Sequence, residues 1–272
     1  MFTILPSQTT VTPQWLNTHL YNEDVIVLDA TMGKDLELAS KCIKGARYFD
    51  ISKLFSDTSN PFPNAFPSEN QFQEEARKLG INRDSIIVVY DDKGIYSSAR
   101  AWWMFKAYGH ENIAVLDGGF PAWLQFSFSI EEGYNSDTVL GNFMAHLQKG
   151  FVCFFKDVKK IIDNKNFSII DARSAERFQC KVPEPREGLR SGQIPNSENL
   201  PYTDVLDNGM LKSKNELKTL FKNSIKDDKT LICSCGSGIT ACILALALYN
   251  IDYKRVCVYD GSWTEWGTQV KV

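Results

Sequence analysis

Several features that would assign this chain to a membrane, a secretory route or nucleic acid are missing from its sequence. It has no long apolar run, so we expect no membrane-spanning helix. Its first ten residues hold neither a basic region nor an apolar core, and no secretory signal is expected. A formal net charge of −3 argues against nucleic acid or an anionic membrane as a partner. The sequence therefore predicts a globular protein without partners of these kinds.

Metal-binding and disulfide patterns are also scarce. Only three histidines are present, and none lies near Cys233 and Cys235 in the sequence, so this C-x-C pair does not complete a zinc site. The seven cysteines are an odd number and form no C-x-x-C pair. Such a content fits reduced thiols in the cytoplasm better than a disulfide framework. We expect a cytoplasmic protein that holds no metal and no organic cofactor.

The sequence repeats itself once along its 272 residues. Three pairs of similar segments recur at offsets of 142 to 144 residues: Asp29 with Asp171, Asp91 with Cys235, and Leu116-Asp-Gly118 with Tyr259-Asp-Gly261. A near-constant offset across separate segments indicates two copies of one domain. Each copy alternates apolar strands with helical stretches, which predicts an α/β fold with a parallel sheet flanked by helices. We expect domains at 1–136 and 154–272, joined by a linker at 137–153.

One stretch of the second copy has the pattern of a reactive site. The apolar run Leu231–Cys233 predicts a buried strand, Gly236 and Gly238 predict a tight loop, and an apolar helix begins near Thr240. Cys235 opens the loop, where backbone N–H groups and the helix N-terminus favour a thiolate nucleophile. The alternative is a buried structural cysteine, which would not need the glycines. Because Asp91 replaces Cys235 in the first copy, we expect that copy to be catalytically silent.

Five stretches give the chain a resemblance to the two-domain rhodanese-like sulfurtransferases, and most of all to their 3-mercaptopyruvate branch. They are Ala99–Phe105, Leu116–Gly119, Pro183–Gly192, Cys235–Ala241 and Tyr259–Trp266. In the thiosulfate branch two cationic residues follow the cysteine, whereas this chain has Gly236 and Ser237 there. The resemblance implies two tandem rhodanese-like domains.

The resemblance also implies a mechanism and a set of site residues. Cys235 would take sulfur from 3-mercaptopyruvate, release pyruvate, and pass the persulfide to a thiol, to thioredoxin or to cyanide. Ser237 would assist in proton handling, and the two arginines of the matching motifs would bind the donor carboxylate. The expected catalytic residues are Cys235 and Ser237, and the expected substrate-binding residues are Arg177, Arg186, Gly236, Gly238, Ile239 and Thr240.

Two positions depart from the mercaptopyruvate branch and keep other functions open. Ser52 and Asn64 stand where the family places an acidic residue and a histidine, and Asn64 cannot relay a proton near neutral pH. Thiosulfate sulfurtransferase and a non-enzymatic persulfide carrier therefore remain alternatives. A rhodanese-fold cysteine phosphatase is disfavoured, because Ala241 occupies the place of the arginine that closes a phosphate-binding loop.

Overall fold

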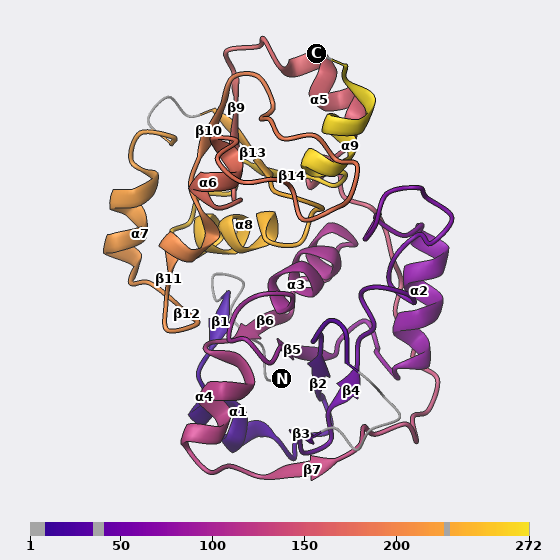
Figure 1. Cartoon of the computed structure of the whole chain (residues 1–272). Helices are drawn as coiled ribbons and strands as arrows, with labels where there is room; N and C mark the ends of the chain where they lie inside the picture. The colour runs from indigo at the N-terminus through magenta and orange to yellow at the C-terminus, as the bar shows by residue number, and fades with distance from the viewer. Residues whose placement is uncertain (1–8, 35–40, 226–228, 272) are drawn as a thin grey trace. The chain divides into compact units, whose positions relative to one another are not determined.

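The computed structural model describes residues 9–34, 41–225 and 229–271 (Figure 1). The chain divides into two compact units. The first unit comprises Met1–Asp57, Phe66–Gln148 and Asn208–Leu211, and the second comprises Thr58–Ala65, Lys149–Asp207 and Lys212–Val272. Asn64 therefore belongs to the unit that carries Cys235. The domain boundaries expected at 136 and 154 stay predictions.

The first unit is built on a five-stranded parallel sheet in the order β1-β6-β5-β2-β4. Its strands are β1 (Thr10–Val11), β2 (Val25–Asp29), β4 (Arg47–Tyr48), β5 (Ile86–Tyr90) and β6 (Ile113–Leu116). The helices are α1 (Pro13–His19), α2 (Glu69–Lys78), α3 (Ser98–Ala107) and α4 (Gly119–Gln125). A small antiparallel pair, β3 (Lys41–Ile43) and β7 (Ile130–Glu132), completes the unit.

The second unit repeats this plan with the sheet order β10-β9-β13-β14-β8. Its strands are β8 (Val152–Cys153), β9 (Phe167–Asp171), β10 (Ser197–Asn199), β13 (Thr230–Ser234) and β14 (Val256–Tyr259). Its helices are α5 (Phe155–Ile161), α6 (Ala175–Phe178), α7 (Lys214–Phe221), α8 (Ala241–Asn250) and α9 (Ser262–Gln269). Between β10 and α7 in the sequence lie the 3₁₀ turn η1 (Tyr202–Val205) and the short strands β11 (Leu206–Asp207) and β12 (Met210–Leu211), of which β12 belongs to the first unit.

Local sequence explains why these elements form where they do. The β5 run Ile-Ile-Val-Val-Tyr is buried throughout, as expected for a strand covered on both faces of a parallel sheet. Helix α1 begins with Pro13, and the Thr12 hydroxyl accepts a hydrogen bond from the N–H of Trp15, so Thr12 caps the helix. Helix α8 is buried on all sides except at its end and packs against β13 and β14. The predicted α/β class with one parallel sheet in each copy is confirmed.

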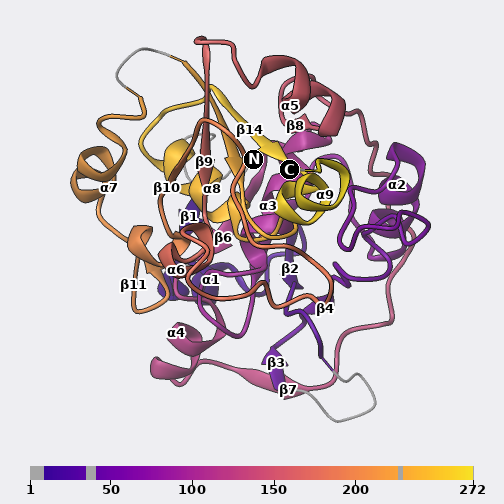
Figure 2. The same ribbon diagram turned by 45° about the horizontal axis from the view of Figure 1, so that its top comes forward.

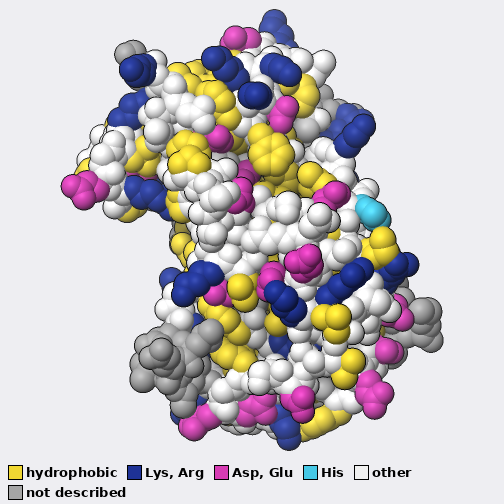
Figure 3. Space-filling view, turned by 90° about the vertical axis from the view of Figure 1, so that its right-hand side faces the viewer, with side chains coloured by type: hydrophobic (Ala, Val, Ile, Leu, Met, Phe, Trp, Pro, Cys, Tyr) yellow, Lys and Arg dark blue, Asp and Glu magenta, His cyan; other side chains and the backbone are white. Residues whose placement is uncertain are grey.

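Helices α5 and α9 lie side by side in the second unit (Figures 1 and 2). The rings of Phe155 and Trp266 bring them together, with centroids 5.5 Å apart. Charged side chains of both signs are scattered over the face shown in Figure 3, in keeping with the small net charge. Within the described part of the chain, no helix is long and apolar enough to cross a membrane.

The expectation that all the thiols are reduced is wrong for one pair. Cys153 and Cys257 form a disulfide, with their Cα atoms 6.3 Å apart. Cys153 lies on the edge strand β8, which pairs in parallel with β14, where Cys257 lies. The two residues are 104 positions apart, and only the pairing of β8 with β14 brings them together, so the cysteine spacing gave no sign of the bond. Cys233 and Cys242 are fully buried, as expected for core residues.

Candidate active site

The Cys235 loop lies between the C-terminal end of β13 and the N-terminus of α8. The loop carbonyls face a neighbouring turn: the N–H groups of Trp263 and Thr264 donate to the oxygens of Cys235 and Gly236, at 3.0 and 2.9 Å. The side chain of Cys235 is almost fully buried. This packing fixes the backbone of the loop from one side.

Four backbone N–H groups of the loop make no hydrogen bond within the described ranges of the chain. They belong to Gly236, Ser237, Ile239 and Thr240. The fifth, that of Gly238, donates to the Ser262 hydroxyl at 3.2 Å. Successive unpaired N–H groups beside a helix N-terminus are a favourable setting for a negatively charged sulfur.

The Ser237 hydroxyl is held by two donors. Its Oγ accepts from Arg186 Nη2 at 3.0 Å and from Asn64 Nδ2 at 3.1 Å. The other Arg186 nitrogen, Nη1, donates to the Thr264 hydroxyl at 3.0 Å, and that hydroxyl donates to the carbonyl of Gly236. Because both acceptor positions of Ser237 Oγ are filled, its own proton is free to be donated elsewhere.

A buried chain of alternating charges leads from β9 to the loop. Asp171, at the end of β9, accepts from Arg173, which in turn donates to Glu184 at 2.8 Å. The other oxygen of Glu184 accepts from Arg177 at 2.6 Å. Burial opposes the charge of Arg173, yet the hydrogen bonds and charges of Asp171 and Glu184 raise its pKa. This row of alternating charges ends at the guanidinium of Arg177, at the edge of the site.

Arg177 lies directly over the residue that follows the cysteine. A Cβ atom at Gly236 would lie 3.0 Å from Arg177 Nη2, so a side chain there would force the guanidinium away. The Nε atom of Arg177 is buried and has no hydrogen-bond partner in the described structure. One donor of this arginine is therefore left for an acceptor outside the chain.

The residues expected at the site are thus gathered around one loop, although the N–H of Gly238 is already engaged by Ser262. Ser52, which replaces the family's acidic residue, lies in the first unit, where its N–H donates to Asp50 Oδ1 at 3.1 Å. Sequence reasoning missed Arg173 and Ser262. Arg173 could have been noticed, because it follows the strand that ends in Asp171 and the first copy has Thr31 at the matching place.

The corresponding loop of the first unit is occupied by its own carboxylate. Asp91 is fully buried, and its Oδ2 accepts from the N–H groups of Tyr96 and Ser98, both at 2.8 Å. Its Oδ1 accepts from the N–H of Lys93 at 2.9 Å. The N–H groups of this loop can still surround an anion, and the group that they surround is the carboxylate of Asp91.

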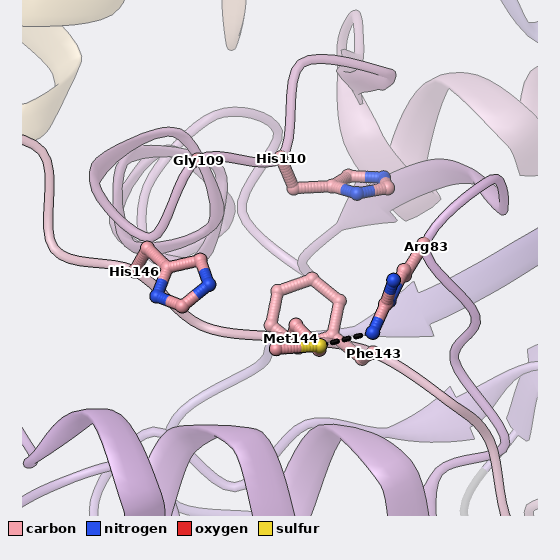
Figure 4. Close-up of a pocket in the computed structure, with 6 residues that line it drawn as sticks. All are labelled: Arg83, Gly109, His110, Phe143, Met144 and His146. Carbon is pink, nitrogen blue, oxygen red and sulfur yellow. Dashed lines mark hydrogen bonds between the residues drawn. The ribbon is translucent and has the colours of Figure 1, made fainter.

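A separate cavity of about 280 Å³ lies in the first unit (Figure 4). Its lining is Arg83, Gly109, His110, Phe143, Met144 and His146. The guanidinium of Arg83 contacts the sulfur of Met144, and His110 Nε2 lies 3.0 Å from the carbonyl of Ser85. Burial lowers the pKa of His110, which favours the neutral ring. No cysteine or serine lines this cavity, and it takes no part in the site at Cys235.

Comparisons with known proteins show the family to which the chain belongs. The rhodanese-like domain model matches residues 12–126 and 155–269. A 3-mercaptopyruvate sulfurtransferase of Mus musculus is 39% identical, over 94% of this chain and 91% of that protein. The crystal structure of SseA from Escherichia coli, a 3-mercaptopyruvate sulfurtransferase, has 35% identity and a TM-score of 0.84, and covers 94% of this chain and 99% of that one. The chain belongs to the two-domain 3-mercaptopyruvate sulfurtransferase family.

This family membership confirms the resemblance found in the sequence, and it makes the chain a sulfurtransferase with two rhodanese-like domains. A second group of relatives carries a broader name. The mitochondrial thiosulfate/3-mercaptopyruvate sulfurtransferase 1 of Arabidopsis thaliana is 35% identical, over 97% of this chain and 77% of that protein. Relatives of this chain are therefore named for two sulfur donors.

Proposed function

We propose that this sulfurtransferase moves sulfur from 3-mercaptopyruvate to a thiol through a persulfide on Cys235. One observation carries the proposal: two arginines, Arg177 and Arg186, lie at the cysteine loop, one over Gly236 and one bonded to Ser237. A donor with a carboxylate and a keto group offers acceptors for both guanidinium groups.

In the first half-reaction the Cys235 thiolate attacks the sulfur of the donor. An S–S bond forms, the carbon–sulfur bond breaks, and its electron pair passes to the carbon as the enolate of pyruvate. Protonation of that enolate gives pyruvate. Ser237 is suited to assist this proton transfer, because Arg186 and Asn64 occupy the lone pairs of its oxygen and leave its proton free.

In the second half-reaction an acceptor thiolate attacks the outer sulfur of the persulfide. A new S–S bond forms between the acceptor and that sulfur, the S–S bond to Cys235 breaks, and Cys235 returns to its thiolate form. The unpaired N–H groups of Gly236, Ile239 and Thr240 stabilise negative charge on sulfur in both half-reactions. A small thiol, thioredoxin or cyanide fits the acceptor role, and rates measured with each would rank them.

The first domain has no nucleophile at the matching loop, and we propose that it is catalytically silent. The carboxylate of Asp91 accepts hydrogen bonds from three N–H groups, including those of Lys93 and Ser98. A carboxylate that occupies its own loop forms no persulfide. The Asp91→Ala variant should therefore still form one persulfide per chain.

A second candidate donor is thiosulfate. Asn64 in place of the family's histidine favours it, because Ser237 is held by a neutral amide rather than by a base. Gly236 and Ser237 count against it, since no cation directly follows the cysteine. A cytoplasmic location stays a prediction. The Cys153–Cys257 disulfide is of a kind rare in that compartment, and cell fractionation would test the location.

Steady-state kinetics of the arginine variants test the proposal. Arg177→Ala and Arg186→Ala should each raise KM for mercaptopyruvate by about 10- to 100-fold, the cost of a lost charged hydrogen bond. Lys181→Ala, which removes an exposed cation just after α6, is the matched control and should leave KM unchanged. Unchanged kinetics in both arginine variants would favour a persulfide carrier that receives its sulfur from another protein.

A further inference from the structure

One residue of the second unit has a backbone conformation that its side chain does not favour. Ser262, the first residue of α9, has φ +49°, in the left-handed region where residues other than glycine, asparagine and aspartate are uncommon. Its side chain is fully buried. Residues held in this way persist only when the surroundings compensate, and they gather at functional sites.

The first unit has the same backbone conformation at the equivalent position, where its residue is a glycine. Gly119 is the repeat partner of Ser262, at the same offset of 143 as Gly118 and Gly261, and it has φ +55°. The next residue in each copy, Phe120 or Trp263, donates its N–H to the carbonyl of the loop residue Asp91 or Cys235. A Cβ at Gly119 would collide with the carbonyl oxygens of Gly94 and Asp91. The backbone turn is therefore shared, and the hydroxyl is a feature of the domain that carries the cysteine.

The hydroxyl of Ser262 forms hydrogen bonds with two residues of the Cys235 loop and with one residue outside it. Its Oγ accepts from the N–H of Cys235 at 3.0 Å and from the N–H of Gly238 at 3.2 Å. Its proton is donated to the carbonyl of Tyr259 at 2.8 Å, which turns both lone pairs toward the loop. The same oxygen lies 3.9 Å from Cys235 Sγ. One atom thus joins the residue that carries the sulfur to the third residue after it.

We infer that Ser262 is a positioning residue for sulfur transfer, an inference that rests on the proposed function of Cys235. By engaging the N–H groups of Cys235 and Gly238, it holds the loop in the shape that leaves Gly236, Ser237, Ile239 and Thr240 with unpaired N–H groups. It also fixes the backbone from which the sulfur projects. Preorganised donors contribute to a reaction only when they are already in place as charge develops.

Removal of the hydroxyl tests this inference. Ser262→Gly permits the same φ and loses only the side chain, and Ser262→Ala keeps the Cβ, should the glycine variant fail to fold. Asp252→Gly is the matched control, because Asp252 also has a positive φ, +66°, but lies at an exposed turn after α8. The measurements are single-turnover persulfide formation over a range of mercaptopyruvate concentrations, and amide hydrogen exchange.

Both Ser262 variants should form persulfide about 10- to 100-fold more slowly at saturating donor, as a displaced reacting group would. The donor concentration for half-maximal rate should change little, and Asp252→Gly should match the wild type. The amides of Cys235 and Gly238 should exchange faster in the Ser262 variants, while those of β13 keep their protection. Persulfide formation within twofold of the wild-type rate would overturn the inference.

A failure of the proposed function would give different results from a failure of the inference about Ser262. If the wild-type protein takes no sulfur from mercaptopyruvate or thiosulfate, the assignment of the reaction fails for all variants alike. Amide exchange needs no donor. Unchanged exchange at Cys235 and Gly238 in Ser262→Gly would then still refute the role of the hydroxyl in holding the loop.

Discussion

Glu184 is buried between two arginines, and the loss of its charge should have a large effect. Its side chain is fully buried, and its two oxygens accept from Arg173 at 2.8 Å and from Arg177 at 2.6 Å. Glu184→Gln keeps the shape but leaves two guanidinium groups facing a neutral amide, which itself brings N–H donors toward them. Breaking a buried ion pair by removing one partner costs about 3–5 kcal/mol. At about 2–4 °C for each kcal/mol, the melting temperature should fall by about 6–20 °C.

The same change should weaken donor binding. Glu184 anchors one nitrogen of Arg177, and Arg177 lies over Gly236 beside the reacting cysteine. Without that anchor, we expect KM for mercaptopyruvate to rise about tenfold, equivalent to about 1.4 kcal/mol, with a smaller change in kcat. Urea unfolding and steady-state kinetics of the same preparations measure both effects.

Glu187→Gln is the matched control for this prediction. Glu187 lies three residues further along the same loop and is exposed, so its neutralisation should change the unfolding free energy by less than about 0.5 kcal/mol. An unfolding free energy of Glu184→Gln within about 1 kcal/mol of the wild type would refute the reasoning. It would mean that the charge of Glu184 is not needed to stabilise the guanidinium groups of Arg173 and Arg177.

Three further predictions follow from other parts of the structure. Asp91→Ala leaves three N–H groups, one buried and two partly buried, without their acceptor and should lower the unfolding free energy by about 2 kcal/mol or more, as urea unfolding would show; a loss below about 1 kcal/mol would contradict it. Asn64→His restores the family's histidine at a backbone position with φ +60° that histidine tolerates, and should raise kcat for mercaptopyruvate relative to thiosulfate; an unchanged ratio would count against a proton-transfer role beside Ser237. Burial lowers the pKa of His110, so the unfolded chain binds a proton where the folded chain does not, and stability should fall as the pH drops from about 6.5 through the folded value. His110→Gln should remove this part of the pH dependence in urea unfolding at pH 7.5 and pH 5.5, and an unaltered dependence would assign it to other groups.

The repeated fold could be predicted from the sequence because its signals are local. The strand run Ile86–Tyr90, the cap at Thr12 and the glycines after Cys235 each specify a short piece of structure from neighbouring residues. The near-constant offset between the copies then extends one prediction to both domains. Arg177 and Arg186 were placed at the loop through family motifs rather than through spacing.

The remaining features depend on contacts between distant segments. Cys153 meets Cys257 only because β8 joins the sheet beside β14. Ser262 reaches Cys235 across 27 residues, and no local pattern distinguishes its hydroxyl from that of any helix-starting serine. The pairing of Glu184 with two arginines likewise follows from the chain's path after β9. Sequence indicated the residue types at the site, and tertiary structure decides which of them touch.

Persulfide formation on a single cysteine tests the central claim most directly. Purified protein is mixed with 3-mercaptopyruvate and its intact mass is measured after one turnover, beside Cys235→Ser and the control Cys180→Ser, which removes an exposed free thiol. The wild type and Cys180→Ser should each gain one sulfur and release one pyruvate per chain, and Cys235→Ser should gain none. A sulfur gained by Cys235→Ser, or none gained by the wild type, would contradict the assignment of the reaction to this loop.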